Sequence, residues 1–217
     1  MFIVIDWIDW SWKGTQIKLI EQYLKDNWKT VKVFDFPRYD CESSYFVKKY
    51  LNWDYWLDVS SKVASQFYAI DRYEASFEIK EALKTCDYVL SNRYVSANMI
   101  HQAWKIKDRE ELVEFLKWLE ELEFETYKIP RPDKVIFLDV EPEIWKKLVW
   151  KKEKREYIKW NENADIHEKD INHLTDAHRA ANFVVDLYPE WTKISCVENW
   201  EILPIDAITQ KILNIIL

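Results

Sequence analysis

Short β-forming runs alternate with longer amphipathic stretches along the chain, and this alternation restricts the fold more than any other feature. The predicted strands span residues 2–6, 30–36, 87–92, 133–140 and 192–197. Apolar residues recur at helical spacing in 15–27, 108–125 and 175–188, and Pro204 and Asp206 suit the start of a final helix. Parallel strands need long crossover connections, which are usually helical. The sequence therefore predicts an α/β fold with a five-stranded parallel sheet flanked by helices, in one domain.

Charge and cysteine content exclude several classes of protein. The net charge of −7 argues against nucleic-acid binding, which requires a basic surface. Three cysteines without CxxC spacing, Cys41, Cys86 and Cys196, argue against a disulfide framework or a zinc site and favour the reducing cytoplasm. The apolar ends of the chain match neither a signal peptide nor a bilayer span, so we expect no membrane association.

The segment "DWIDWSWKGTQ" (6–16) joins the first predicted strand to the first predicted helix. This is the setting of a phosphate-binding loop, in which N–H groups at a helix N-terminus bind an anion. Lys13 stands where such loops place the lysine that reaches the β- and γ-phosphates, and the Thr15 hydroxyl is placed to lie near Mg²⁺. On these residues alone, a strand–helix junction with an incidental lysine is an equal alternative.

Glycine is nearly absent from the chain, whereas tryptophan is in excess. The chain has one glycine, Gly14, and 13 tryptophans, although ordinary usage of about 7% predicts roughly 15 glycines. Replacing three loop tryptophans with glycine gives "DGIDGSGKGTQ", which matches a phosphate loop with Gly-Thr in place of the usual Ser/Thr. Nine tryptophans fall in predicted turns, loop tips or helix ends that suit glycine: Trp7, Trp10, Trp12, Trp28, Trp53, Trp56, Trp104, Trp160 and Trp200.

We hypothesise that these nine residues are glycines encoded by UGA and misread as tryptophan. Trp118 and Trp191 differ, because they lie in amphipathic or pre-strand contexts where a large aromatic side chain can pack. The alternative is that all tryptophans are real. Three indole rings would then crowd the N–H groups of the loop and weaken ATP binding.

Further segments carry a family resemblance. They are "FPRY" (36–39), "SQFYAIDRYE" (65–74), "VLSNRYVSANMIHQ" (89–102), "FLDVEPE" (137–143) and "DIHE" (165–168). In this order and at these spacings, with the loop, they resemble thymidylate kinase, a P-loop nucleoside-monophosphate kinase. The resemblance covers the whole chain and implies a three-layer P-loop kinase fold in a single domain, 1–217, with a mobile basic lid at approximately 150–166. It implies transfer of the ATP γ-phosphoryl group to dTMP to give dTDP, with Mg²⁺ as cofactor, and makes a homodimer an expectation.

The resemblance also assigns roles to residues. The ATP phosphates would be held by Trp7, Ile8, Asp9, Trp10, Ser11, Trp12, Lys13, Gly14 and Thr15, with Asp9 and Thr15 near Mg²⁺. The dTMP site would comprise Asp9, Phe36, Arg38, Tyr68, Arg72, Arg93, Asn98, His101 and Gln102. In that site Arg38 would clamp the phosphate, Tyr68 would stack on thymine, and Arg72, Asn98 and Gln102 would read the base. The catalytic cations would be Lys13, Arg93 and, from the lid, Arg155.

Several of these roles have a simpler alternative. Phe36 also suits core packing, Arg72 suits a surface ion pair with Glu74, and His101 suits a plain surface position.

The chain also departs from the family pattern. Asn92 stands where the family usually has an acidic residue and Ala97 where a serine is usual, so metal binding or acceptor orientation would depend more on Asp9. The alternatives for the whole chain are another nucleoside-monophosphate kinase, such as an adenylate kinase, or a catalytically dead nucleotide-binding protein if Trp7, Trp10 and Trp12 are real.

Overall fold

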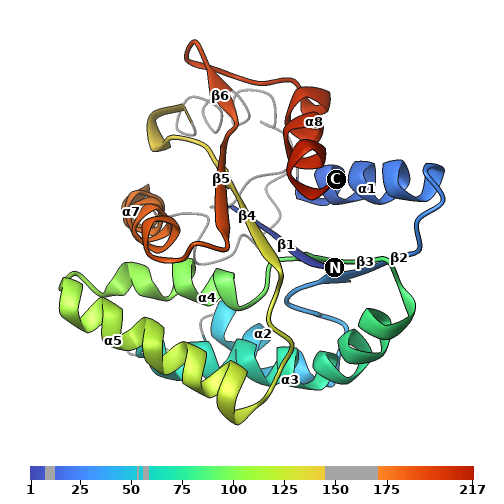
Figure 1. Ribbon diagram of the computed structural model, residues 1–217. Helices are drawn as coiled ribbons and strands as arrows, with labels where there is room; N and C mark the ends of the chain where they lie inside the picture. Colours follow the sequence, from blue (N-terminus) through green and yellow to red (C-terminus); the bar gives the residue numbers. More distant parts are fainter. Residues whose placement is uncertain (8–12, 53, 56–58, 145–170) are drawn as a thin grey trace, which may run out of the picture.

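Five parallel strands form the central sheet of the computed structural model, which describes residues 1–7, 13–52, 54–55, 59–144 and 171–217 (Figure 1). The strand order is β2-β3-β1-β4-β5. The strands are β1 (Phe2–Trp7), β2 (Val31–Asp35), β3 (Tyr88–Asn92), β4 (Lys134–Asp139) and β5 (Trp191–Ser195). The predicted α/β class and five-stranded parallel sheet are therefore confirmed. No helix in the described part of the chain is long and apolar enough to cross a membrane.

Helices cover both faces of the sheet and give the three layers expected (Figure 1). One face packs against α1 (Lys13–Asp26) and α8 (Ile205–Ile216). The other packs against α3 (Ser61–Thr85), α4 (Val95–His101), α5 (Arg109–Glu120) and α7 (Ile171–Leu187). The shorter elements are η1 (Glu42–Ser44), α2 (Tyr45–Leu51), η2 (Ala103–Lys105) and the π-helix η3 (Glu121–Thr126).

The central strand β1 shows why the strands could be predicted. Its side chains alternate between the two layers: Phe2 and Val4 pack toward the α3–α5 layer, and Ile3 and Ile5 toward α1 and α8. Because both faces are covered, the strand is a continuous apolar run without polar alternation.

Several element boundaries differ from the sequence prediction, most of them by one or two residues. Helix α7 begins at Ile171, so the suggested N-cap at Thr175 or Asp176 is wrong. A threonine or aspartate is tolerated inside a helix when packing continues it, and α7 buries the small residues Ala177 and Ala180 just beyond. The predicted strand 192–197 ends at Ser195, and a separate hairpin of β6 (Val197–Glu198) and β7 (Glu201–Ile202) follows.

The turn after α1 contains Trp28 in a left-handed conformation, with φ of 61°. The Lys29 amide donates to the Leu24 carbonyl at 3.0 Å, and the Trp28 amide donates to the Lys25 carbonyl at 3.0 Å. These two bonds define a Schellman motif with Trp28 at the position that glycine usually occupies. The Trp28 side chain is 95% exposed, so packing does not explain its presence.

The hairpin between β6 and β7 contains a second turn of this kind. Its two-residue loop, Asn199 and Trp200, has φ of 51° and 64°, and Glu198 pairs with Glu201 across it. Two successive positive φ values define a type I′ turn, for which Asn-Gly is the preferred sequence. Trp200 is 69% exposed. Both turns therefore support the glycine hypothesis.

The other described tryptophans have different backbones. Trp7 is the last residue of β1 and is buried, and Trp104 lies in η2, partly buried against the core. Neither has the positive φ seen in the two turns. Trp118 stacks on Phe115 and Trp191 is buried, as predicted for real aromatic residues. The remaining members of the suspected set, Trp10, Trp12, Trp53, Trp56 and Trp160, lie outside the described residues.

Candidate active site

The carboxyl ends of the parallel strands lie at one edge of the sheet, where open α/β sheets bind their ligands. Strand β1 ends at Trp7 and α1 begins at Lys13, so a strand and a helix flank the predicted phosphate loop as expected. Loop residues 8–12, which include Asp9, and the lid residues 150–166, which include Arg155, lie outside the described residues, as does the side chain of Lys13. Gly14 and Thr15 lie in the first turn of α1.

Helix α1 is tied to the end of the chain. The Gln16 side chain donates from Nε2 to the Ile205 carbonyl at 3.0 Å, and Thr209 donates to Gln16 Oε1 at 2.8 Å. Gln16 is buried, so these bonds fix the N-terminal turn of α1 against the start of α8.

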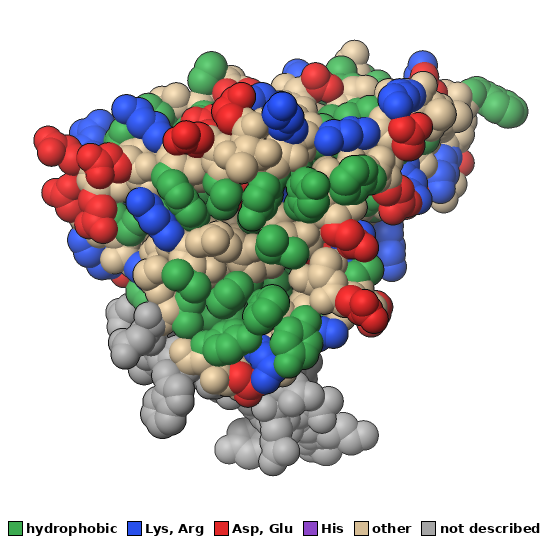
Figure 2. Space-filling model, turned by 90° about the horizontal axis from the view of Figure 1, so that it is seen from below, with side chains coloured by type: hydrophobic (Ala, Val, Ile, Leu, Met, Phe, Trp, Pro, Cys, Tyr) green, Lys and Arg blue, Asp and Glu red, His purple; other side chains and the backbone are tan. Residues whose placement is uncertain are grey.

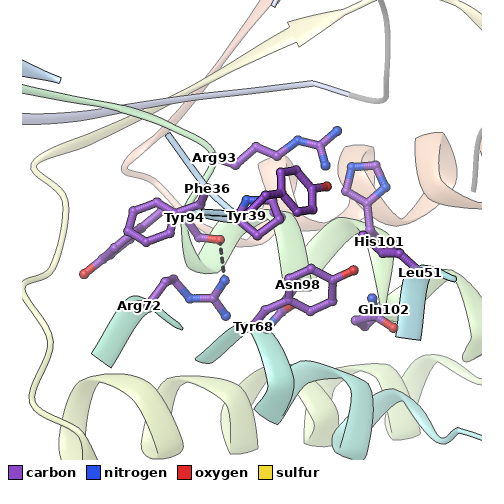
Figure 3. A pocket seen from close by; sticks show the side chains of 12 residues that line it. Phe36, Tyr39, Leu51, Tyr68, Arg72, Arg93, Tyr94, Asn98, His101 and Gln102 are labelled. Carbon is purple, nitrogen blue, oxygen red and sulfur yellow. Dashed lines mark hydrogen bonds between the residues drawn. The ribbon is translucent and has the colours of Figure 1, made fainter. Parts of the chain in front are cut away.

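A pocket lies beside this edge, between α3, α4 and the ends of β2 and β3 (Figure 3). Its empty volume is about 480 Å³, part of which is open to solvent. Seven of the nine residues predicted for dTMP line it: Phe36, Tyr68, Arg72, Arg93, Asn98, His101 and Gln102. Pro37, Tyr39, Leu51, Tyr94 and Ala97 complete the described lining, which therefore contains two arginines and no carboxylate.

Arg93 follows β3 and has φ of 61°, a conformation that costs a non-glycine residue energy. Its amide donates to the Ile5 carbonyl at 3.0 Å, and its carbonyl accepts from Ser91 Oγ at 2.6 Å. The backbone around Arg93 is therefore held on both sides while its side chain enters the pocket (Figure 3). Strained residues of this kind concentrate at functional sites.

Arg72 reaches the pocket from α3 and is 1% exposed. Its Nε and Nη2 donate to the two carboxylate oxygens of Glu123, each at 2.6 Å, and its Nη1 donates to the Tyr94 carbonyl at 3.2 Å. The suggested surface pair with Glu74 is therefore wrong, because a buried carboxylate from η3 holds Arg72 instead.

Two amide side chains present acceptors near the pocket. Asn98 donates from Nδ2 to the Ser65 carbonyl at 3.0 Å, which leaves its Oδ1 as the outward acceptor. Gln102 is almost fully buried, and its Oε1 has no hydrogen-bond partner among the described residues. Buried polar atoms without a partner are rare, so this acceptor indicates a site for a donor on a ligand.

Aromatic rings form the walls of the pocket. Phe36 is buried and lies 5.8 Å from the Tyr94 ring, so it packs in the core and lines the pocket at once. Tyr68 is half-buried and meets the Tyr50 ring edge-on. His101 is buried rather than a plain surface residue, and its Nε2 lies 3.4 Å from the Trp7 carbonyl at the start of the loop. It therefore connects the pocket to the loop.

Arg38 is not among the lining residues of the pocket. Its Nε bonds Asp71 Oδ1 at 3.0 Å, and its Nη2 bonds Ser43 Oγ at 3.2 Å and the Glu74 carboxylate. Burial works against the charged guanidinium, but Asp71 and Glu74 together raise the pKa of Arg38. In this conformation α3 holds the arginine beside the pocket.

A carboxylate lies next to Asn92 although that residue is itself neutral. Asn92 is the cross-strand partner of Asp35, and its Nδ2 donates to Asp35 Oδ1 at 2.5 Å. The Asn92 Oδ1 atom is buried and has no hydrogen-bond partner within the described part of the chain. The neighbouring strand thus brings a negative charge to the end of β3.

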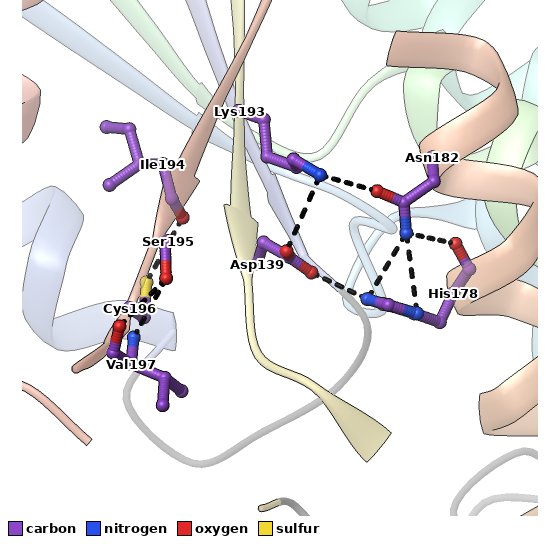
Figure 4. Close-up of polar contacts among 8 residues, drawn as sticks. All are labelled: Asp139, His178, Asn182, Lys193, Ile194, Ser195, Cys196 and Val197. Carbon is purple, nitrogen blue, oxygen red and sulfur yellow. Dashed lines mark hydrogen bonds and ion pairs between the residues drawn. The ribbon is translucent and has the colours of Figure 1, made fainter. Parts of the chain in front are cut away.

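A second polar cluster lies at the end of β4 (Figure 4). His178 Nε2 lies 2.8 Å from Asp139 Oδ1, and Lys193 Nζ lies 2.7 Å from Asn182 Oδ1 and 3.9 Å from Asp139 Oδ2. These contacts join β4 and β5 to α7. Nearby, burial raises the pKa of the Cys196 thiol to about 12, so this cysteine stays protonated and is not a nucleophile.

Four residues at the site were not predicted from the sequence: Tyr39, Leu51, Tyr94 and Glu123. Tyr39 and Tyr94 lie inside quoted motifs, and their proximity to predicted residues was the available signal. Leu51 comes from α2, which was not predicted. Glu123 lies in the part of the predicted helix 108–125 that forms η3, but only tertiary packing brings these two residues to the site.

Comparison with known proteins places the chain in a family. The family model described as thymidylate kinase matches residues 5–195. The thymidylate kinase of Plasmodium falciparum (isolate 3D7) is 30% identical over 102 residues, 47% of this chain and 48% of that protein. The chain thus matches about half the length of that relative.

Two further similarities agree with that result. The thymidylate kinase of Mycobacterium tuberculosis (strain CDC 1551 / Oshkosh) is 24% identical over 147 residues, 66% of this chain and 68% of that protein. A solved structure of thymidylate kinase from Candida albicans superposes with a TM-score of 0.70 at 18% identity, covering 99% of this chain and 90% of that one. The structural similarity shows the fold, and the family model, which spans most of the sequence, shows that the chain belongs to the thymidylate kinase family.

Proposed function

We propose that the protein transfers the γ-phosphoryl group of ATP to dTMP, giving dTDP. The observation that carries this proposal is the pairing of a fixed donor and a fixed acceptor in one pocket. Arg72 can only donate, and Asn98 is oriented to accept through Oδ1. A thymine edge offers a carbonyl next to an N–H group, so it complements this pair. Tyr68 and Phe36 supply aromatic surface for the ring.

Phosphoryl transfer requires positioning and charge neutralisation more than covalent chemistry. Arg93 lines the pocket at the carboxyl end of β3, so it is placed to stabilise negative charge between the acceptor phosphate and ATP. The loop amides, Lys13 and Arg155 are proposed to hold the donor phosphates. Arg38 is proposed to exchange its contacts with Asp71 and Glu74 for the dTMP phosphate.

Mg²⁺ fits the donor set at this edge of the sheet. Thr15, Asp35 and Asn92 offer hydroxyl, carboxylate and amide oxygens, which are the ligands that Mg²⁺ prefers, and the Asn92 Oδ1 atom is buried without a partner in the described residues. When bound with ATP, the ion neutralises phosphate charge. We propose these residues, with Asp9, as its neighbours.

A coupled assay of ADP formation tests the proposed activity. The full chain, made with glycine at positions 7, 10 and 12, should phosphorylate dTMP and, more slowly, dUMP, but not AMP or GMP. Preference for AMP would favour an adenylate kinase. Calorimetry with ATP and dTMP on the same chain separates an enzyme from a dead nucleotide-binding protein, and absence of both binding and turnover would overturn the proposal.

The outer face of α3 supports a homodimer, which we also propose. Val63, Ile70, Tyr73 and Phe77 are exposed on this helix, and Figure 2 shows apolar side chains gathered on the corresponding face of the molecule. In an antiparallel pair of α3 helices centred on Ile70, Val63 of one copy meets Phe77 of the other. The face is therefore self-complementary, as a two-fold interface requires.

Sedimentation velocity tests the dimer. The mass derived from sedimentation should be twice the 26.5 kDa of one copy. Ile70→Asp should give monomers, because it places a charge at the centre of an apolar interface. Tyr23→Asp, at an exposed position on α1, is the matched control and should stay dimeric. A monomeric parent chain at micromolar concentration would rule out this interface.

We propose a cytoplasmic location for the protein. Its three cysteines form no disulfide. Unpaired thiols suit a reducing compartment, where disulfides are rare. Cell fractionation with an antibody against the chain would test this location, and recovery in an exported fraction would contradict it.

A further inference from the structure

Glu123 is a fully buried carboxylate that contacts a lining residue of the pocket but does not itself line it. Its residue exposure is 0%, and it lies in the π-helix η3 at the end of α5. A buried charge needs a partner that satisfies it fully. Arg72 is that partner, through two bonds of 2.6 Å in the side-on, bidentate arrangement.

The geometry of this pair determines which part of Arg72 remains available. A guanidinium has five N–H groups on three nitrogens. Glu123 accepts one from Nε and one from Nη2, and the Tyr94 carbonyl accepts one from Nη1. Two N–H groups remain, one on Nη1 and one on Nη2, and Arg72 lines the pocket. Their direction is fixed because Glu123 and Tyr94 hold the other three N–H groups of the same plane.

We propose that Glu123 is a positioning residue that fixes Arg72 as a rigid donor toward a carbonyl of the acceptor base. This inference rests on the proposed function and extends it by assigning the discrimination between 4-oxo and 4-amino pyrimidines to a residue outside the pocket. An arginine free to rotate would place its donors over a range of directions. An arginine clamped on two sides presents them at one place, where a 4-amino group, itself a donor, is rejected.

The Glu123 carboxylate also acts on the aromatic residues around it. Its charge adds to burial in raising the pKa of Tyr94 and of Tyr127, so both phenols remain protonated. Tyr94 also supplies the carbonyl that accepts from Arg72 Nη1, and its ring packs on Phe36 in the wall of the pocket. The carboxylate, the guanidinium and the pocket wall are therefore one connected unit.

The test is discrimination between dTMP and 5-methyl-dCMP, which differ in the group at position 4, oxo or amino, and in the hydrogen on N3. Glu123→Gln keeps the size of the side chain but replaces an acceptor oxygen with an amide donor. We expect the KM for dTMP to rise and the preference for dTMP over 5-methyl-dCMP, measured as a ratio of kcat/KM values or of competitive binding constants, to fall by about 10-fold or more. The KM for ATP should not change.

A role limited to stability would lower activity toward both nucleotides together and leave their ratio unchanged. The matched control is Glu125→Gln, because Glu125 lies in the same π-helix but pairs with Arg131 on the surface. Glu125→Gln should leave the KM for dTMP and the preference for dTMP over 5-methyl-dCMP as they are in the parent chain. If Glu123→Gln does not fold, Glu123→Asp retains the charge with a shorter side chain and should show an intermediate loss of the ratio.

An unchanged ratio in a folded Glu123 variant overturns the inference. Failure of the parent chain to phosphorylate dTMP would instead overturn the proposed function, so the two failures are distinguishable. All variants are made in the chain with glycine at positions 7, 10 and 12.

Discussion

Arg93 and Trp28 have the same left-handed backbone, each with φ of 61°, in two very different regions. Arg93 is held by Ile5 and Ser91 on both sides and puts its guanidinium into the pocket. Trp28 lies at the glycine position of a helix-ending turn and leaves its indole ring in solvent. We propose that function explains the strain at Arg93, whereas our hypothesis for Trp28 is that the residue is a misread glycine.

The largest effect is expected for the suspected glycines in the predicted phosphate loop. Replacing Trp7, Trp10 and Trp12 together with glycine should raise kcat/KM for ATP by about 100-fold or more, because backbone amides can then approach the phosphates. A coupled ADP assay measures this. Equal activity of the two chains would show that the tryptophans are compatible with catalysis.

Arg93→Gly removes the strain and the charge together. It should lower kcat by about 100- to 1,000-fold, since a donor aimed at the transferring phosphate is lost, while thermal stability is maintained or slightly raised. Lys128→Gly is the control, because Lys128 has φ of 52° but does not line the pocket. Normal kcat in Arg93→Gly would remove the functional explanation for its backbone.

Trp28→Gly and Trp200→Gly should each stabilise the fold by about 1 kcal/mol, because glycine adopts a positive φ without steric cost. Urea unfolding measures the change, and kcat should stay the same. Trp191→Gly is the opposite case: it removes a buried side chain and should destabilise by about 3–5 kcal/mol.

The codons at these positions give a separate test of the glycine hypothesis. UGA at positions 28 and 200 with UGG at 118 and 191 would support the hypothesis. UGG at all four positions would reject it, whatever the unfolding measurements show.

The smallest effect is expected at Asp87, which binds Thr30 two residues after Trp28. Asp87 accepts from the Thr30 amide and hydroxyl, which lowers its pKa below the ordinary 3.8. A carboxyl whose pKa is lowered in the folded state contributes stability above its unfolded pKa, and this is lost as pH falls through the folded pKa. The stability difference between the parent chain and Asp87→Asn should therefore be constant near neutral pH and shrink below about pH 4. The gain from Trp28→Gly should not depend on pH, and urea unfolding across this range separates the two.

Much of the fold could be predicted from the sequence because the sheet is buried on both faces, which makes each strand a compact apolar run. Helix α3 was not predicted as an element, although it has 25 residues. Its buried face consists largely of small or polar residues, such as Ala64, Ser65 and Ala69, so the apolar spacing typical of a helix is weak.

The pocket was predictable only through the family resemblance, which named seven of its lining residues. Glu123 could not be found in this way, since its partner Arg72 lies 51 residues away and only folding joins them. Likewise, the acidic charge beside Asn92 comes from another strand, so the sequence around Asn92 gave no indication of Asp35.

The bonds from Gln16 to Ile205 and Thr209 have a consequence for how the protein is made. They link positions 189 and 193 residues apart, so the first helix receives its support from a segment that is synthesised much later. Domains generally fold as units as the chain leaves the ribosome. A nascent chain that has not yet reached Thr209 would hold the first turn of α1 without this anchor.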